Sequence, residues 1–398
     1  MPEPRYRVLA ICSHPVQYMS PVLRRMAQHP KLDLQVVYCT LRGAEPVHDP
    51  DFNTTFQWDV PLLDGYKWLE VPNRGSGSDS FFGLFNPGLV RVIRNGNYDA
   101  VLSYTGYICA SFWLSFVAAR LSGASFLFGT DTSSLEPRDS RRWKVVLKKM
   151  FWPYLFRLAD QVIAPSSAGV QMMLSLRVPR ERITLTPFVV DNDWWSAEAA
   201  RVNRATVRKS WGIAPEASVV LFCAKLQPWK RPVDLLRAFA AADVPSAVLV
   251  FAGDGPLLTQ LNSEAKALGI ESRVRFLGFI NQMQLPSVYS AADLLVLPSE
   301  YDPCPVVVCE SMVCGLPVLL SDKIRGRFDL VIPGQTGEIF PCGDVNAIAM
   351  ALRKLLADRA ALATLSENAR ARMNSWSLQE AIAGTVQAID QSLKRRQR

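Results

Sequence analysis

Two carboxylates and two ammonium groups of this 398-residue chain stand where they could bind a phosphorylated ligand. Asp302 lies in a proline-rich turn that follows the apolar run 292–297, and Glu310 lies two helical turns further on. Lys225 and Lys230 follow another apolar run. Ammonium groups neutralise phosphate well, and a carboxylate suits sugar hydroxyls better than phosphate. The pattern indicates a site for a ligand that carries both phosphate and hydroxyl groups.

Each of these residues follows a short apolar run of the kind that forms a buried parallel strand. Open α/β sheets bind ligands at the carboxyl ends of their strands, where helix N-termini attract phosphate. The alternation of apolar runs and helical segments predicts two doubly wound α/β sheets. The alternative is that Asp302 is only a turn residue and N-cap, and that Glu310 is a solvated helix position.

The size and charge of the chain indicate a globular protein with two domains and an anionic partner. Lys and Arg number 44 and Asp and Glu 36, which leaves a net charge of +8. That charge favours nucleotides, acidic glycans or phospholipid surfaces without choosing among them, and no nucleic-acid partner is expected. The predicted domains are residues 1–195 and 196–375, with a C-terminal helix, 376–398, packing back on the first domain.

The eight cysteines show neither zinc spacing nor a Cys-x-x-Cys pair. They are interpreted as small buried apolar residues in a reducing compartment, and no metal is expected. The N-terminus begins directly with a strand-like segment and has no signal-peptide pattern, so the expected location is cytoplasmic.

Three other segments carry open interpretations. Residues 42–83 have poor periodicity and form either an acceptor-side wall of the site or a packing loop. Residues 138–151 predict a helix with cations on one face and apolar side chains on the other, ended by Pro153. This helix either covers a core or makes a peripheral contact with an anionic membrane. Residues 394–398 are expected to form a frayed basic tail.

The chain resembles the retaining glycosyltransferases of family 4, most strongly over its second half. The Asp302 to Glu310 spacing is similar to the family's Glu-x7-Glu motif. Three further segments match family motifs in order: Ala224-Lys225-Leu226 with Lys230-Arg231-Pro232, Ala252-Gly253-Asp254-Gly255-Pro256, and Phe276-Leu277-Gly278. The resemblance implies a GT-B fold, in which two Rossmann-like domains face a central cleft.

The resemblance also implies roles for individual residues. Lys225 and Lys230 would bind the diphosphate of a nucleotide-sugar, Glu310 its ribose hydroxyls, and Gly278 and Phe279 would lie by the base. The implied catalytic residues are Asp131, Lys225, Lys230 and Asp302. The implied nucleotide-sugar-binding residues are Lys225, Lys230, Gly253, Gly278, Phe279, Asp302, Cys304, Val306, Val307 and Glu310. The acceptor-side candidates are His14, Gln17 and Tyr18.

The chain departs from the family pattern at two places. Pro303-Cys304-Pro305 stands where the family has Gly-aromatic-Gly, which removes two N–H donors. In the first half, Asp131 stands for the family's cleft histidine, and Ser13 to Tyr18 replace its glycine-rich loop. His14 in that loop either touches phosphate or acceptor or is a packed loop histidine.

The predicted reaction is transfer of a sugar, with retention, from a nucleotide-diphosphate-sugar of the UDP or GDP type to an acceptor hydroxyl. The acceptor is a glycan, a lipid-linked or a small molecule, and the expected setting is bacterial polysaccharide or glycoconjugate synthesis in the cytoplasm or on the inner face of the plasma membrane. No cofactor or metal is expected, because lysines and a helix N-terminus can stabilise the leaving diphosphate. The alternatives are a non-catalytic nucleotide-sugar or glycan-binding protein and a nicotinamide-dependent oxidoreductase, which the missing G-x-G-x-x-G disfavours.

Overall fold

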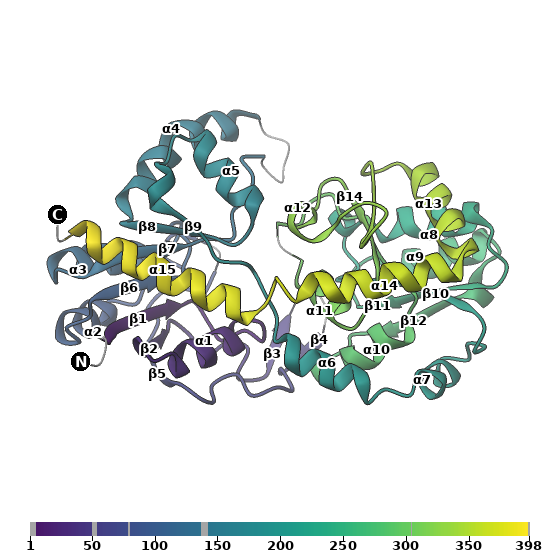
Figure 1. The fold of residues 1–398 in the computed structure, drawn as a ribbon, viewed down its shortest axis with the longest axis horizontal. Coiled ribbons are helices and arrows are strands. Elements are labelled where there is room, and N and C mark those ends of the chain that lie inside the picture. The colour runs from purple at the N-terminus through teal and green to yellow at the C-terminus, as the bar shows by residue number, and fades with distance from the viewer. Residues whose placement is uncertain (1–4, 50–53, 79, 137–141, 304, 397–398) are drawn as a thin grey trace. The chain divides into compact units, whose positions relative to one another are not determined.

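The computed structural model describes residues 5–49, 54–78, 80–136, 142–303 and 305–396. The chain forms two compact units, whose elements are labelled in Figure 1. Unit 1 consists of Met1–Pro46, Pro61–Val189 and Leu378–Arg398, and unit 2 of Val47–Val60 and Val190–Ser377. The chain changes unit between Val189 and Val190, whereas the predicted boundary lies between residues 195 and 196.

Unit 1 is built on a seven-stranded sheet in which every pairing is parallel, with the order β5-β2-β1-β6-β7-β8-β9. Its central strands are buried on both faces, which explains their nearly continuous apolar sequences. The strands are β1 (Tyr6–Cys12), β2 (Leu32–Tyr38), β5 (Lys67–Glu70), β6 (Ala100–Ser103), β7 (Ser125–Gly129), β8 (Gln161–Ala164) and β9 (Ile183–Leu185).

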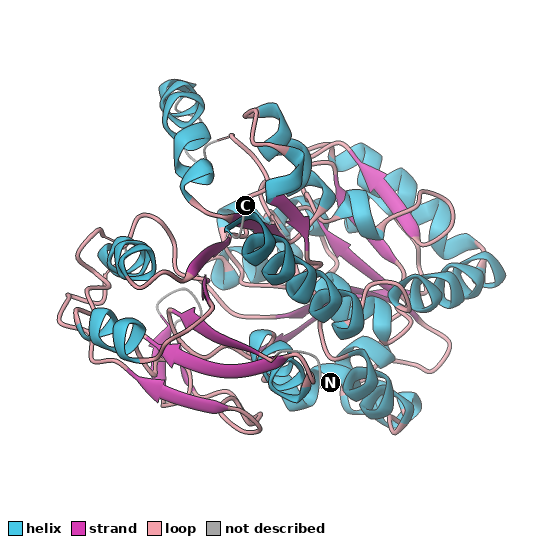
Figure 2. Ribbon diagram, turned by 60° about the vertical axis from the view of Figure 1, so that its left-hand side comes forward, coloured by secondary structure: helices cyan, strands magenta, loops and turns pink. Residues whose placement is uncertain are grey.

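The strands lie among helices, as the view in Figure 2 shows, and the C-terminal helix α15 packs on β7, β8, β9 and α1. Gly384 of α15 lets the helix approach the edge strand, because a Cβ there would lie 2.7 Å from the carbonyl oxygen of Leu185. The helices are α1 (Met19–Gln28), α2 (Gly88–Asn95), α3 (Ala110–Leu121), α4 (Arg142–Leu158), α5 (Ser167–Ser175) and α15 (Leu378–Arg396), with the short 3-10 helix η1 (Arg180–Arg182).

Two sequence predictions that fall in unit 1, the end of a helix at Pro153 and a frayed C-terminal tail, differ from the structure. Pro153 lies inside α4 instead of ending it, and the buried side chains of Trp152 and Phe156 hold the two halves of that helix on the core. The basic C-terminus is helical to Arg396. Arg395 donates to the carbonyl oxygens of Asp160 and Glu181, so the part of the tail that is described is tied to the sheet.

Unit 2 is built on a six-stranded sheet, again with parallel pairings throughout, in the order β12-β11-β10-β13-β14-β15. This order reverses between β10 and β13, which makes their carboxyl ends the switch point of a doubly wound fold. The strands are β10 (Ser218–Cys223), β11 (Ala247–Ala252), β12 (Val274–Gly278), β13 (Leu294–Leu297), β14 (Val318–Ser321) and β15 (Gly337–Phe340).

The segment around the predicted domain boundary, residues 190–215, contains two helices of unit 2. Asp191 and Asn203 cap them, since their side chains accept from the backbone N–H groups of Trp194 and Thr206. The helices of unit 2 are α6 (Asn192–Ala200), α7 (Arg204–Ser210), α8 (Pro232–Ala242), α9 (Leu258–Ala267), α10 (Leu285–Ala291), α11 (Val306–Val313), α12 (Arg327–Leu330), α13 (Val345–Ala357) and α14 (Arg359–Met373), with the 3-10 helices η2 (Pro228–Lys230), η3 (Glu271–Arg273) and η4 (Gln282–Gln284).

The insertion 42–83 is more ordered than its sequence suggests. Residues Lys67–Glu70 form β5, an edge strand of the unit 1 sheet whose largely exposed side chains explain the missing apolar run. Within residues 47–60, β3 (Val47–Asp49) and β4 (Thr54–Phe56) pair as an antiparallel hairpin that belongs to unit 2. The hairpin packs on residues 279–283, in the second half of the chain, and the acceptor-side role of the insertion stays a prediction.

Candidate functional site

The switch point of unit 2 brings together the loops that follow β10 and β13. The loop after β10 carries Lys225 and Lys230, and the turn after β13 carries Asp302. Two backbone hydrogen bonds fix the turn: Glu300 N–H donates to Trp229 O at 2.8 Å, and Arg325 N–H donates to Asp302 O at 2.9 Å. Residues that are far apart in sequence thus form one polar surface at the edge where α/β sheets bind ligands.

Lys230 and Asp302 form an ion pair within this surface. Lys230 Nζ donates to Asp302 Oδ2 at 2.6 Å, and the two side chains are only 19% and 11% exposed. A charge pair this shielded from water holds its geometry better than a surface pair. The carboxylate therefore orients the ammonium group that the sequence assigns to the diphosphate.

The remaining cations of the loop differ in their surroundings. Lys225 is half-buried. Arg231 has a left-handed backbone (φ 52°) at the start of α8, and its guanidinium pairs with Asp234 at 2.6 Å and Glu300 at 3.7 Å. Arg231 thus pairs with two carboxylates and Lys230 with Asp302, and Lys230 stays the predicted phosphate ligand.

Helix α11 begins directly after the acidic turn. Pro305 is its N-cap residue and supplies no side-chain cap. The N–H groups in the first turn of a helix have no intrahelical partner, so those of Val306 and Val307 suit an anion. Cys304, the other predicted amide donor, lies outside the described residues.

Glu310 is buried in α11, where its side chain is surrounded by uncharged polar groups. Only 2% of the residue is exposed, and Tyr289 Oη donates to Glu310 Oε2 at 2.7 Å. Burial raises the pKa of Glu310 to about 7, while hydrogen bonds from Tyr289 and Gln282 oppose that rise. The interpretation of Glu310 as a solvated helix position is therefore wrong, and its carboxyl titrates near neutral pH.

Three buried side-chain oxygens in the segments that follow β10, β12 and β13 have no hydrogen-bond partner among the described residues. They are Gln227 Oε1 in the loop after β10, Gln282 Oε1 in η4, and Ser299 Oγ in the turn after β13. Buried polar atoms are almost always satisfied, so orphans gathered in the loops of one sheet edge fit a site that takes a polar ligand. Sequence reasoning missed Gln227, Gln282, Tyr289 and Ser299, none of which belongs to a recognisable motif.

Gly253 and Gly278 bring the loops after β11 and β12 close to the loop after β10. Gly253 N–H donates to Gly278 O at 2.8 Å, and both glycines have positive φ angles, 147° and 71°. A Cβ at Gly253 would overlap the carbonyl oxygen of Ala224. The structure thus gives Gly253 a packing role beside the predicted lysine loop, and Phe279 follows Gly278 at the next loop.

Gly253→Ala is expected to lower the free energy of unfolding by at least about 2 kcal/mol more than Gly269→Ala does. Both glycines have positive φ, but a Cβ at Gly269 would meet nothing within 4 Å. Gly253, at φ 147°, also lies further from the conformations that alanine adopts than Gly269 does, at φ 67°, so the difference reports the overlap with the Ala224 backbone together with this backbone strain. Urea unfolding of the two variants measures it, and equal destabilisation would show that the loops move apart easily.

The acceptor-side candidates lie in unit 1, in the loop that follows β1. Ser13 Oγ and His14 Nδ1 are 3.0 Å apart, and the ring centroids of Tyr18 and Phe188 are 4.8 Å apart. Burial, followed by the positive charge of Arg42, lowers the pKa of His14, so its imidazole is neutral at pH 7. Gln17 is half-buried in the same loop.

Asp131 lies in the loop after β7 of unit 1 and is exposed. Strand β7 is separated from β1 by β6, so Asp131 and His14 follow strands at the same edge of the sheet. The catalytic role of Asp131 and the acceptor role of His14 stay predictions, as do the ligand contacts of the residues in unit 2.

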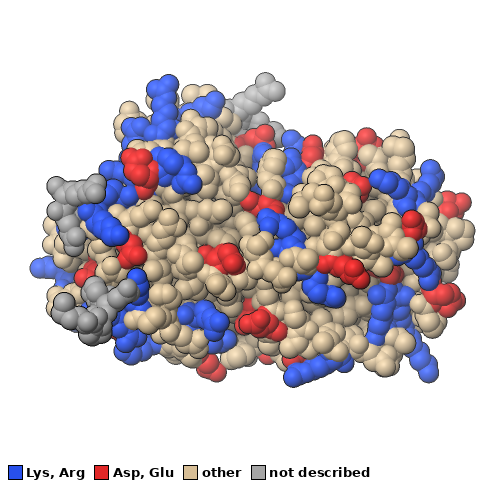
Figure 3. Space-filling model, in the orientation of Figure 1, with Lys and Arg blue, Asp and Glu red and all other residues tan. Residues whose placement is uncertain are grey.

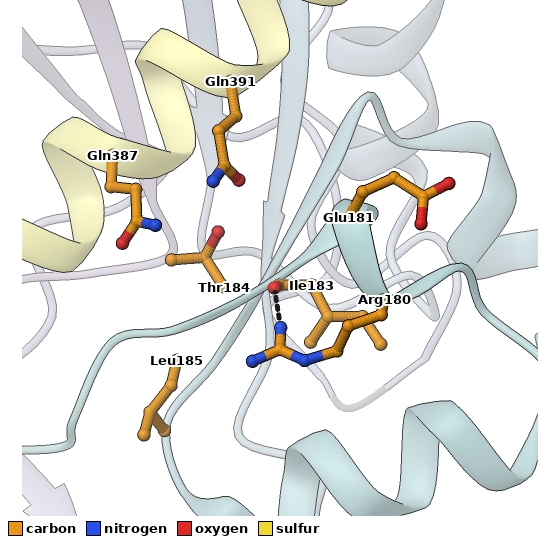
Figure 4. Close-up of a pocket in the computed structure, with 7 residues that line it drawn as sticks. All are labelled: Arg180, Glu181, Ile183, Thr184, Leu185, Gln387 and Gln391. Atoms are coloured by element: carbon orange, nitrogen blue, oxygen red, sulfur yellow. Dashed lines mark hydrogen bonds between the residues drawn. The ribbon is translucent and has the colours of Figure 1, made fainter.

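A pocket of about 520 Å³ lies elsewhere in unit 1, between α15 and the edge strand β9. Figure 4 shows Gln387 and Gln391 of α15 facing the residues of η1 and β9, where Arg180 donates to the carbonyl oxygen of Ile183. None of the predicted site residues lines it. It borders the side of an edge strand, whereas ligands of this fold class bind at the carboxyl ends of strands.

The described residues include neither a cluster of metal ligands nor a membrane-spanning helix. No group of three or more His, Cys, Asp or Glu side chains in the described chain is arranged to hold a metal ion. No helix in the described ranges combines the length and apolarity needed to cross a bilayer. Figure 3 shows basic and acidic side chains interspersed over one face, in keeping with a moderate net charge of +8.

Comparison with known proteins bears on the family and the fold of the chain. Residues 22–194 match the model described as Glycosyltransferase Family 4, and residues 203–372 match Glycosyl transferases group 1. HepE of Anabaena, solved with UDP and glucose, has a similar fold, with a TM-score of 0.73 and 20% identity over 97% of this chain and 100% of that one.

Two curated relatives are similar over part of their length. D-inositol 3-phosphate glycosyltransferase 2 of Catenulispora acidiphila is 33% identical over 46% of both chains. N-acetyl-alpha-D-glucosaminyl L-malate synthase of Bacillus anthracis is 25% identical over 71% of both chains. The chain thus spans between about half and about three quarters of the length of these relatives.

The two parallel-sheet units and the switch-point site define a GT-B fold, as predicted. The chain belongs to the glycosyltransferases of the family 4 type. This membership sets aside the nicotinamide-dependent oxidoreductase alternative.

Proposed function

We propose that this protein transfers a sugar, with retention of anomeric configuration, from a nucleotide-diphosphate-sugar to an acceptor hydroxyl. The observation that carries the proposal is the shielded Lys230–Asp302 pair at the switch point of unit 2. The pair lies between the loop after β10, which carries the lysines, and the start of α11. The buried Glu310 lies one helical turn after that start.

In the proposed reaction the anomeric carbon exchanges its bond to the diphosphate oxygen for a bond to the acceptor oxygen, and the acceptor hydroxyl loses its proton. Negative charge grows on the departing diphosphate. Lys225, Lys230 and the first N–H groups of α11 stabilise that charge, which lowers the barrier without a metal ion or cofactor. Asp131 and Asp302 stay candidates for contacts with the reacting sugar and acceptor.

The donor is proposed to be of the UDP type. HepE, whose fold this chain shares, has been solved with UDP and with UDP-glucose. The proposed acceptor is a glycan, a lipid-linked or a small molecule of bacterial polysaccharide or glycoconjugate synthesis, and the proposed setting is the cytoplasm.

Thermal unfolding with UDP, GDP and ADP, each alone and with its common sugars attached, tests the donor. A ligand that binds only the native state raises the melting temperature by mass action, so UDP and one UDP-sugar should raise it most. Release of UDP from that sugar nucleotide by the pure protein then tests catalysis. Stabilisation without turnover with any acceptor would favour the non-catalytic alternative.

We also propose that α4 contacts an anionic membrane surface. The side chains predicted to lie on its apolar face are exposed to solvent and do not cover a core, which is the observation that favours this proposal. They are Trp143, Val146, Leu147, Met150 and Phe151, each at least 49% exposed. Lys144, Lys148 and Lys149 lie on the same helix, whereas residues 138–141 of the predicted segment lie outside the described residues.

Replacing Leu147 and Met150 together by glutamate is expected to weaken binding to phosphatidylglycerol vesicles about tenfold or more, because both side chains would insert into the interface. Val117→Glu, on a comparably exposed apolar position of α3, is the matched control. Vesicle co-sedimentation measures the effect, with phosphatidylcholine vesicles as the uncharged reference. Equal binding by the double variant and the control would remove α4 as the contact.

A further inference from the structure

The hairpin segment 54–60 makes specific contacts with the loop 278–283 of unit 2. The ring centroids of Phe56 and Phe279 lie 4.6 Å apart at an angle of 31°. Asn281 Nδ2 donates to Gln57 O at 2.7 Å, and Met283 N–H donates to Asp59 Oδ1 at 3.0 Å. An aromatic contact and two hydrogen bonds therefore attach this segment to one short loop.

The loop that receives the hairpin leads directly to the buried carboxyl group of the site. Asn281 and Met283 flank Gln282, whose side chain hydrogen-bonds Glu310 and whose Oε1 has no partner among the described residues. The hairpin thus binds on both sides of the residue that contacts Glu310. At the other end of the loop, Phe56 packs on Phe279, which follows the strand end at Gly278.

We infer that the hairpin forms the outer wall of the nucleobase site and that Phe56 is a donor-binding residue. The inference rests on the proposed function, because it takes the nucleoside to lie between Phe279 and Glu310. A base stacks favourably on an aromatic ring whatever its hydrogen-bonding pattern. Phe56 and Trp58, whose centroids are 5.0 Å apart, extend the aromatic surface of Phe279 with side chains from the first half of the sequence.

Binding of two ligands that differ only in the base tests this role. UDP and ribose 5-diphosphate share the ribose and the diphosphate, so the ratio of their dissociation constants reports the contribution of the base. Phe56→Ala is expected to weaken UDP binding about tenfold and to leave ribose 5-diphosphate binding unchanged. Phe56→Tyr keeps the ring and should bind UDP as the unmodified protein does.

Two further variants separate stacking from general damage. Asp59→Ala removes the acceptor for Met283 N–H and should weaken UDP binding in the same base-dependent way. Phe82→Ala truncates a phenylalanine of unit 1 that is 64% exposed, and it should leave the dissociation constants of both ligands unchanged. The donor KM should rise in Phe56→Ala while kcat stays near the unmodified value, because the hairpin contacts no reacting atom.

Each result bears on one proposal. If Phe56→Ala binds UDP as tightly as the unmodified protein does, or weakens the binding of UDP and of ribose 5-diphosphate by the same factor, the hairpin is not a wall of the base site. If the unmodified protein binds no nucleoside diphosphate at all, the proposed function itself is wrong.

Discussion

Replacing Lys230 by alanine is expected to lower kcat for sugar transfer about 100- to 1,000-fold. The ammonium group is held 2.6 Å from Asp302 Oδ2, beside the strand ends where the leaving diphosphate is proposed to bind and to gain negative charge. Its loss also leaves the Asp302 carboxylate, only 11% exposed, without its cation beside an anionic ligand. Both effects act in the same direction, which makes this the largest expected loss of activity.

Release of UDP under single-turnover conditions measures the chemical step directly. Lys230→Arg keeps the charge and should retain more activity than Lys230→Ala, although a planar guanidinium cannot reproduce the geometry of a compact ammonium group. Lys209→Ala, on an exposed lysine of α7, is the matched control and should leave the rate unchanged. Full activity of Lys230→Ala would contradict the placement of the diphosphate.

Replacing Glu310 by glutamine is expected to weaken donor binding about 10- to 100-fold and to abolish its pH dependence. An ionised carboxylate accepts hydrogen bonds from ribose hydroxyls more strongly than the protonated acid or an amide does. With a pKa of about 7, Glu310 is protonated in part of the unliganded protein at neutral pH. The affinity for UDP-glucose should therefore rise from about pH 6 to about pH 8 and then level off.

Titration calorimetry with UDP-glucose measures this dependence, because its diphosphate diester does not titrate near neutral pH. The Glu310→Gln curve should be flat across the same range. Glu271→Gln, on an exposed position of η3, is the control and should follow the unmodified curve. A pH-dependent affinity that persists in Glu310→Gln would assign the titration to another group.

Glu310→Gln is expected to weaken donor binding but to raise the free energy of unfolding. Burial raises the pKa of Glu310 from 4.5 to about 7, so the native state binds the proton more tightly than the unfolded state does. The stabilising contribution of this protonation is complete below about pH 4.5 and is lost as the pH rises through about 7. Glu310→Gln, which carries no charge, should gain up to about 3 kcal/mol relative to the unmodified protein between about pH 5 and about pH 8. Urea unfolding at both pH values measures this gain.

Local sequence pattern was enough to predict the strands and the loops that carry the lysines and the acids. Strands β1, β6 and β11 coincide with nearly continuous apolar runs of the sequence, because a strand buried on both faces rarely accepts polar residues. Since parallel strands end at one edge of a sheet, the loops holding Lys230 and Asp302 could be expected to meet.

Pattern was insufficient wherever a residue's environment depends on a distant partner. The helical period of α4 shows that its two faces differ, but it does not say which face meets solvent, and the predicted apolar face proved exposed. Likewise, β5 is an edge strand with exposed side chains, so its sequence resembles that of a loop.

The sequence by itself determined the fold class and the candidate ligand groups, because buried strands and strand-end motifs leave a local record in the order of residues. Only the tertiary structure decided what surrounds those groups. Tyr289 and Gln282 contact Glu310 because α10 and η4 pack beside α11. The hairpin that carries Phe56 joins unit 2, although more than 200 residues separate Phe56 from Phe279. Such contacts depend on how whole elements pack, and no local period or spacing encodes them.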